Sequence, residues 1–294
     1  MNVVLPSPVE VTPRVRGQWA HLVGAAVRTP RGAVASVLAG AVVILAVVGP
    51  FITPYGSDAP VTTPFSGPSS KYLLGSDELG RDVLSRVLAG AWEMLAMALA
   101  ATALGVLLGA AAGVSAAYLK GGADGLIMRT VDVFLAFPQL VFALLLISII
   151  GPRIWLIILA VGLTHAPASA RVLRSAALEI SERDYVKAVE LQGVRPAKVM
   201  RSEILPNLVS PLMVESGLRF TYSIVLMAGL SFLGFGLPPP APNWGYMVQE
   251  NRLGLSLNVW AVAAPAILIA LLTIGINTFT DAVARVAIGV EGRD

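Results

Sequence analysis

The sequence has no cysteine, only two histidines and few charged residues among its 294 positions. Without cysteine the chain can form no disulfide framework, no thiolate metal site and no thiol nucleophile. Charged residues make up 13% of the chain and hydrophobic residues 56%. Because a soluble domain carries about 25% charged residues, this balance predicts a polytopic membrane protein. The formal net charge of +3 is too small to indicate nucleic-acid binding.

Six apolar segments are long enough to cross a bilayer, which takes about 20 consecutive apolar residues. Five of them contain no charged residue, and the remaining one contains Glu215 and Arg219. In chain order they are 33–52, 94–119, 133–152, 154–170, 208–237 and 253–280. We therefore expect an all-α membrane protein with six transmembrane helices.

Four arginines precede the first apolar segment, namely Arg14, Arg16, Arg28 and Arg31. By the positive-inside rule they place the N-terminus in the cytoplasm, and six spans return the C-terminus there. The first segment is longer than the apolar region of a signal peptide and begins late, so a retained anchor is favoured over a cleaved signal. The predicted order is a cytoplasmic segment (1–32), a first span (33–53), an external segment (54–91), a core with five spans (92–281) and a cytoplasmic tail (282–294).

The external segment begins with a stretch rich in proline, threonine, serine and glycine, which disfavours regular structure. After it, Ser76-Asp77-Glu78 predicts the start of a short helix running towards Leu88. Two interpretations of the charged residues that follow stay open, and the second is favoured. These charged side chains either face an external partner or bond to the backbone of their own segment. The residues concerned are Asp77, Glu78, Arg81 and Asp82.

Small residues and prolines mark the spans. Gly105, Gly109 and Gly113 lie on one face of the second span, where small residues let two helices approach closely. Packing within the chain is favoured here over a contact between subunits. Three prolines, Pro138, Pro167 and Pro265, fall within or near spans and predict kinks.

Residues 184–207 form a mixed-charge, helix-compatible island that is too polar for the bilayer. Ser181 or Asp184 can cap a helix, and Gly193 can end it in the left-handed conformation. Pro196 suits the first turn of a second short helix, which should stop near Pro206. Such an exposed helix either docks on a soluble partner or lies on the lipid headgroups.

Three ionisable features lie within or beside the spans. Glu215 and Arg219 are spaced i, i+4 with the acid first, which favours a self-satisfied ion pair over a gate or pathway role. Arg129 and Asp132, three residues apart, are likewise expected to form an ion pair with each other. His165 is expected to be a packed or interfacial histidine rather than a ligand, and no metal site is predicted.

Several blocks of the sequence resemble one family. Ala188, Gly193 and the ending Leu205-Pro206, at this spacing, resemble the EAA loop of bacterial ABC-transporter permease subunits. Lys187 stands where that family usually has glutamate, and Glu190 is the candidate substitute. Residues 74–86, 129–138, 230–236 and 240–245 resemble the DppC/OppC branch, and the whole resemblance covers about residues 30–285.

The resemblance implies a type I ABC importer permease fold with six transmembrane helices and a cytoplasmic coupling helix. It implies a second, DppB/OppB-like permease, two ATPase subunits and an external substrate-binding protein as partners, in a bacterial cytoplasmic membrane. The coupling residues would be Lys187, Ala188, Glu190, Gly193, Val194, Arg195, Pro196, Lys198, Val199, Met200, Arg201, Leu205 and Pro206. In the docked coupling helix, Val199 and Met200 would pack into the ATPase groove.

The expected function is import of di- or oligopeptides, with ATP and magnesium held by the ATPase subunits and no cofactor on this chain. The sequence agrees, since it contains no Gly-x-x-x-x-Gly-Lys-Ser/Thr loop to bind ATP phosphates. Three alternatives remain: nickel chelates or another small solute as cargo, an intramembrane enzyme, and a static scaffold. An enzyme would need a nucleophile with a base at membrane depth, and His165 is the only candidate base.

Overall fold

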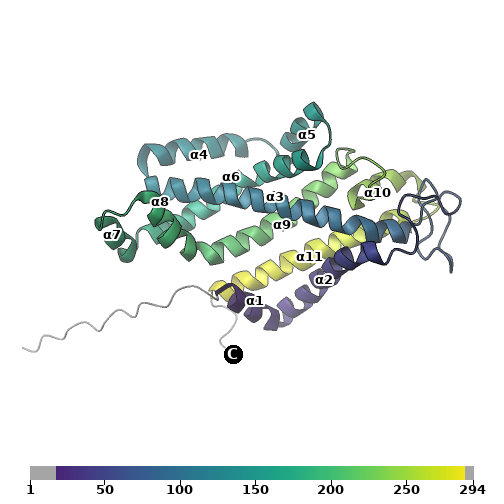
Figure 1. Cartoon of the computed structure of the whole chain (residues 1–294), viewed down its shortest axis with the longest axis horizontal. Coiled ribbons are helices and arrows are strands. Elements are labelled where there is room, and N and C mark those ends of the chain that lie inside the picture. Colours follow the sequence, from purple (N-terminus) through teal and green to yellow (C-terminus); the bar gives the residue numbers. More distant parts are fainter. Residues whose placement is uncertain (1–17, 289–294) are drawn as a thin grey trace, which may run out of the picture.

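The structure is a computed structural model that describes residues 18–288, and the regular secondary structure of these residues is helical apart from two isolated β-bridges. Figure 1 shows an elongated bundle in which the long helices run side by side. In chain order the elements are α1 (Gln18–Arg28), α2 (Pro30–Val48), η1 (Gly49–Phe51), α3 (Val83–Leu119), α4 (Gly121–Leu135), α5 (Gln139–Ile150), α6 (Ile154–Ser181), α7 (Asp184–Leu191), α8 (Pro196–Val199), η2 (Met200–Ile204), η3 (Leu205–Leu208), α9 (Val209–Phe232), α10 (Trp244–Asn251), η4 (Arg252–Gly254) and α11 (Trp260–Ile288).

The pairing of α3 with α6 forms the centre of the bundle, and α9 lies between α3 and α11 (Figure 1). The main apolar core runs through these helices and includes Met94 of α3, Ile157 of α6 and Ile224 of α9. α2 covers α11 on one side, and α4 lies against α3 and α6 on the other.

The glycines of α3 explain why it packs so closely on α6. A Cβ at Gly105 would lie 2.8 Å from the Gly162 carbonyl oxygen, and one at Gly109 would lie 2.5 Å from the Cβ of Ser169. At Gly113 the same atom would come within 2.4 Å of the Ala170 oxygen. The predicted packing within the chain is therefore confirmed, because only glycine leaves room for the facing helix.

Four single helices are long and apolar enough to cross a membrane, namely α2 extended through η1, α3, α6 and α11. The bent pair α4 and α5 makes a fifth candidate. The segment 208–237, expected as a further span, is the 24-residue helix α9, which carries Glu215 and Arg219 and does not reach the same hydropathy. Charged side chains in such a helix face the interior of the bundle, and Glu215 is indeed buried.

The prediction of one continuous span over 133–152 is wrong. α4 ends at Leu135, α5 begins at Gln139, and the two axes differ by 82°. Pro138 accounts for the break, because it cannot donate a helical hydrogen bond and restricts the preceding residue to extended backbone. By contrast, Pro167 and Pro265 lie inside continuous helices.

The predicted short helix after Ser76 is also wrong. The residues before Val83 form turns, and Val83 begins a single helix of 37 residues that continues to Leu119. Its cap is Asp82, whose carboxylate accepts hydrogen bonds from the amide of Ser85 at 2.8 Å and its hydroxyl at 2.6 Å. The capping carboxylate thus lies five residues later than expected.

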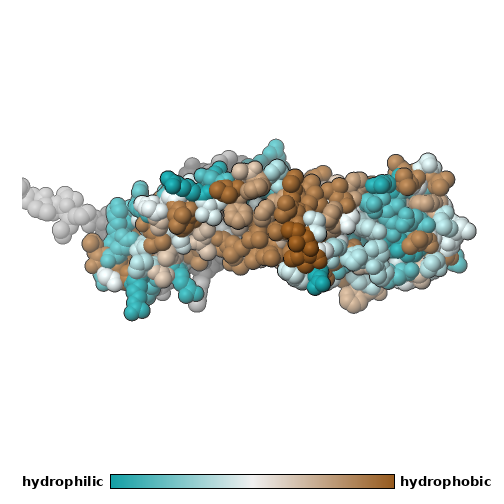
Figure 2. All heavy atoms as spheres, turned by 90° about the horizontal axis from the view of Figure 1, so that it is seen from above, coloured by the Kyte–Doolittle hydropathy of each residue, from teal (hydrophilic) through white to brown (hydrophobic). Residues whose placement is uncertain are grey.

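The two ends of the bundle differ in structure. Residues 49–82 and α10 form one end, here named the cap end, and α7 with α8 forms the other, the α7–α8 end (Figure 1). The face in Figure 2 shows an apolar band across the middle and hydrophilic surface towards both ends. α1, within the expected N-terminal segment, packs on α11 through Ala26, and α11 continues to Ile288.

Candidate functional site

The island at 184–207 folds as a helix, a glycine turn and a second short helix. α7 begins at Asp184 after Arg183, which provides no side-chain cap, and Ser181 is instead the last residue of α6. Gly193 has a φ of +75°, a conformation that favours glycine, so the predicted break is confirmed. Pro196 is the first residue of α8, also as predicted.

The predicted stop at Pro206 is wrong. After α8 the chain continues through the π turn η2 and the 3-10 turn η3 directly into α9. Changes of helical pitch accommodate the missing donor of Pro206, because π and 3-10 turns shift which carbonyls must be bonded. One helical path therefore connects the α7–α8 end to α9. A displacement of α8 is thus transmitted along the chain to α9.

A small apolar core of its own supports the α7–α8 end. Val186, Val199 and Ile204 are fully buried and pack with Val114 of α3 and Ile180 of α6. Val199, which was expected to insert into a partner, instead faces this core. Its contacts hold α7 and α8 against the ends of α3 and α6.

The outer surface of this end is basic. Among the predicted coupling residues, Val194, Met200 and Pro206 are half-buried. Those that are exposed are Lys187, Ala188, Glu190, Gly193, Arg195, Pro196, Lys198, Arg201 and Leu205. Glu190 also lies near Tyr118 of α3.

Leu191 is the residue that sequence reasoning missed at this end. It is 90% exposed at the last position of α7, two residues before Gly193. Its exposure could have been predicted from its position, because few side chains surround an apolar residue at the end of a short helix next to a glycine turn. This end of the bundle thus presents both exposed basic side chains and an exposed aliphatic side chain.

Glu215 and Arg219 form the predicted pair within α9, with Nε of Arg219 donating to Oε1 of Glu215 at 2.6 Å. The hydroxyl of Ser169 on α6 donates to the same oxygen at 2.8 Å, so the pair also links α6 to α9. The guanidinium of Arg219 lies 5.5 Å from the ring centre of Tyr222. His165, one turn before Ser169, is fully buried as predicted, and neither of its ring nitrogens has a hydrogen-bond partner among the described residues.

The expected pairing of Arg129 with Asp132 is wrong. Asp132 instead accepts from Nη2 of Arg171 on α6 at 2.5 Å. A neighbouring pair joins the same two helices, since Asp124 of α4 accepts two hydrogen bonds from Arg174 of α6, at 2.6 and 2.5 Å. Ion pairs in both halves of α4 thus fasten it to α6.

The cap end contains a buried network of four charges. Arg81 donates through Nε to Asp77 at 2.6 Å and through Nη2 to Glu250 of α10. Arg86 of α3 lies 3.3 Å from Asp77 and 3.2 Å from Glu250. All four side chains are at most 3% exposed. The network fastens the external segment, α3 and α10 to one another.

Three of the four residues considered as partner-facing are therefore buried, namely Asp77, Arg81 and Asp82. Asp77 also accepts hydrogen bonds from the amides of Leu79 and Arg81, both at 2.9 Å. These bonds agree with the favoured interpretation, in which the charged residues bond to the backbone of their own segment. Glu78 is only half-buried.

The pKa values of Glu78 and Arg81 are both shifted by this network. Burial and the nearby Glu250 carboxylate raise the pKa of Glu78. Burial alone would lower the pKa of Arg81, but the hydrogen bond to Glu250 and the charge of Asp77 raise it overall.

Glu250 and its neighbour Asn251 were missed in the sequence. The side chain of Asn251 accepts from the Glu78 amide at 3.0 Å, and that of Asn258 donates to the Leu74 and Ser76 carbonyls at 3.0 Å. One indication was available, since Glu250 is the only acidic residue between Glu215 and Asp281. An isolated acid beside apolar sequence needs a basic partner, and Arg81 and Arg86 are such partners.

An elongated bundle of apolar helices, with charges paired inside it and polar surface at both ends, defines a multi-pass membrane protein. Residues 105–287 match the family model "Binding-protein-dependent transport system inner membrane component", and the chain belongs to this family. Within it the chain is a permease of the DppC/OppC type. It is therefore a transport permease and not an enzyme.

Similar proteins with assigned names are also transport permeases. The chain is 35% identical over 247 residues to the di/tripeptide transport system permease protein DppC of Pseudomonas aeruginosa, covering 82% of each chain. It is 31% identical over 242 residues to the dipeptide transport system permease protein DppC of Alkalihalophilus pseudofirmus, covering 81% of this chain and 79% of the relative. It is 35% identical over 215 residues to the glutathione transport system permease protein GsiD of Pectobacterium atrosepticum, covering 73% and 71%.

A solved structure shows the same fold. A chain of the MetNI methionine ABC transporter, in an inward-facing conformation, superposes with a TM-score of 0.56 at 20% identity. The match covers 68% of this chain and 95% of the other. The predicted all-α type I importer permease fold is thereby confirmed.

Proposed function

We propose that the chain is one of two permease subunits of an ATP-driven importer for di- or oligopeptides. The relatives that support this carry dipeptide, di/tripeptide or glutathione in their names, which favours a peptide over a nickel chelate. Its partners are a second permease, two ATPase subunits and an external substrate-binding protein, all in or at a bacterial cytoplasmic membrane. ATP and magnesium bind to the ATPase subunits.

The observation that carries the proposal is the construction of the α7–α8 end. A basic surface with an exposed leucine is held by a core shared with α3 and α6, and continues as helix into α9. Such a rigid element converts the closing of an ATPase into movement of the spans, which is the requirement for alternating access. This end is then cytoplasmic, as are both termini.

Docking is electrostatic as well as apolar in this arrangement. Arg195, Lys198 and Arg201 face outward and suit an acidic rim, while Leu191 suits an apolar hollow inside that rim. Lys187 is exposed on the same side, so this chain presents a cation where its family usually presents a glutamate. The matching ATPase surface is expected to carry a compensating acid.

The test is Gly193→Val in the complete complex reconstituted in liposomes. A branched residue is strained at a φ of +75°, so the turn between α7 and α8 is distorted. We expect the complex to assemble with two ATPase chains and a second permease and to hydrolyse ATP, but to take up labelled dipeptide at about a tenth of the normal rate or less, a loss of about 1.4 kcal/mol in coupling.

Gly151→Val is the matched control. Gly151 has a φ of +93° and lies at the opposite end of the bundle, between α5 and α6. A branched residue is strained there too, because φ is again positive, but the site lies away from the docking surface, so coupling should persist. Normal uptake in the Gly193 variant, or equal uncoupling in both, would refute the assignment.

A further inference from the structure

The break between α4 and α5 leaves non-helical backbone open to its surroundings. Ala136, Phe137 and Pro138 connect the two helices, and all three are exposed in this chain. The side chain of Phe137 is 54% exposed. Pro138 provides no side-chain cap for α5, so the first amides of α5 have no side-chain partner at this point. The last carbonyls of α4 are bonded only in part, by the amides of Ala136 and Phe137.

The break lies near the middle of the bilayer. Its neighbours on α6 are Leu163, Thr164 and Pro167, which are nine to thirteen residues from the start of that helix at Ile154. At a rise of about 1.5 Å per residue they lie about 14 to 20 Å along α6. The hydrocarbon core is about 30 Å thick, and the exposed Trp155 marks the level of its surface.

Lipid cannot cover such a break. In hydrocarbon, each unpaired amide or carbonyl is costly, and irregular backbone occurs at membrane depth only where protein buries it or water reaches it. The surface at 136–138 therefore faces either another protein chain or an aqueous passage.

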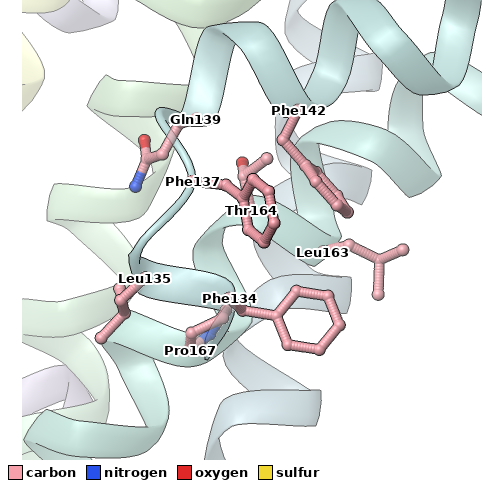
Figure 3. A pocket seen from close by; sticks show the side chains of 8 residues that line it. All are labelled: Phe134, Leu135, Phe137, Gln139, Phe142, Leu163, Thr164 and Pro167. Carbon is pink, nitrogen blue, oxygen red and sulfur yellow. The ribbon is translucent and has the colours of Figure 1, made fainter. Parts of the chain in front are cut away.

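A cavity of about 60 Å³ opens at this break (Figure 3). Three phenylalanines surround it: the ring of Phe142 lies 5.9 Å from that of Phe134 and 6.3 Å from that of Phe137. Thr164 and Gln139 are its polar neighbours. In Figure 3 the rings and Thr164 gather on one side of the break, and Gln139 projects away from them.

We propose that this break and its cavity face the translocation pathway and bind an apolar side chain of the passing peptide. The inference rests on the proposed function. Mostly apolar walls with a few polar groups characterise small-molecule sites, and broken helices at membrane midplane line transport sites in other folds. The cavity holds one side chain, while Gln139, which can both donate and accept, pairs with a peptide unit of the substrate.

The natural absence of cysteine permits a direct test. In the reconstituted complex, Phe137→Cys should react with a charged, membrane-impermeant thiol reagent, and Leu-Leu should slow that reaction several-fold. The matched control is Val37→Cys, 69% exposed on α2, which is expected to face lipid and therefore not to react.

Two results would overturn the inference. Failure of Phe137→Cys to react, both without nucleotide and during ATP turnover, would mean that a second protein chain covers the break. Reaction at a rate that Leu-Leu leaves unchanged would mean that the break is wet but binds no side chain.

A second variant tests selectivity. Leu163→Phe replaces an aliphatic side chain in the cavity wall by a larger aromatic one and so fills the cavity. The kcat/KM for Leu-Leu should then fall about tenfold relative to that for Gly-Gly, in line with the selectivity of apolar pockets. An unchanged ratio refutes the subsite. If the unsubstituted complex imports no peptide at all, the proposed function fails instead, and the thiol reaction still reports whether the break is wet.

Discussion

Glu250 is the acceptor that two buried arginines share at the cap end. Arg81 and Arg86 are 3% and 1% exposed, so neither can turn to water if its partner is lost. Asp77 supplies the second negative charge, and the four groups balance. Buried charges are tolerated only when paired in this way.

Glu250→Gln should therefore destabilise the cap end, because it leaves two arginines with one carboxylate. Breaking a buried ion pair costs about 3 kcal/mol or more. We expect a lower thermal midpoint for the detergent-purified complex, measured by size-exclusion chromatography after heating. Asp58→Asn removes an exposed carboxylate that acts on Arg86 through its charge alone, so it should lower the midpoint much less. Equal midpoints for both variants would show that the network does not hold this end.

Whole elements follow the sequence where periodicity and end signals agree, and two of the departures occur at a proline. The glycine face of α3, the turn at Gly193 and the start of α8 at Pro196 were predictable, because each depends on local backbone rules. Pro138 breaks its span while Pro206 does not stop its helix. Local rules cannot separate these cases, because the carbonyls that a proline leaves free can be accommodated by a change of pitch or by tertiary contacts.

The burial of Asp77, Arg81 and Asp82 was less predictable for a different reason. Arg81 bonds to Glu250, which lies 169 residues away in the chain, and one sequence contains no direct record of such a contact. The same holds for Ser169, which the sequence did not connect with Glu215.

At the scale of helix pairs, Gly109→Ala tests the contact of α3 with α6. The new methyl group would lie 2.5 Å from the Cβ of Ser169 and 2.8 Å from the Ala166 oxygen. Overpacking of this kind costs about 1–3 kcal/mol, so the thermal midpoint should fall. Gly40→Ala on α2, where nothing lies within 4 Å of the added atom, is the control and should be neutral. A neutral Gly109 variant would mean that the two helices can separate without cost.

For the whole molecule, the distribution of charge and the proposed docking role of the α7–α8 end predict one orientation in the membrane. The arginines before α2 and the basic surface of α7 and α8 should be cytoplasmic, with the cap end outside. The two ends have exposed positions suited to labelling, Ser70 in the cap end and Ala197 in α8. Since the chain contains no cysteine, a single introduced thiol is the only one on it.

In intact cells or spheroplasts expressing the complex without its ATPase subunits, so that α8 is uncovered, Ser70→Cys should react with an impermeant maleimide. Ala197→Cys should react only after the membrane is permeabilised. This result follows if residues 49–82 reach the binding protein while α8 reaches the ATPase, since these partners lie on opposite sides of the bilayer. The reverse labelling pattern would exclude ATPase docking at α8 and, with it, the transmission of movement through η2 and η3 into α9.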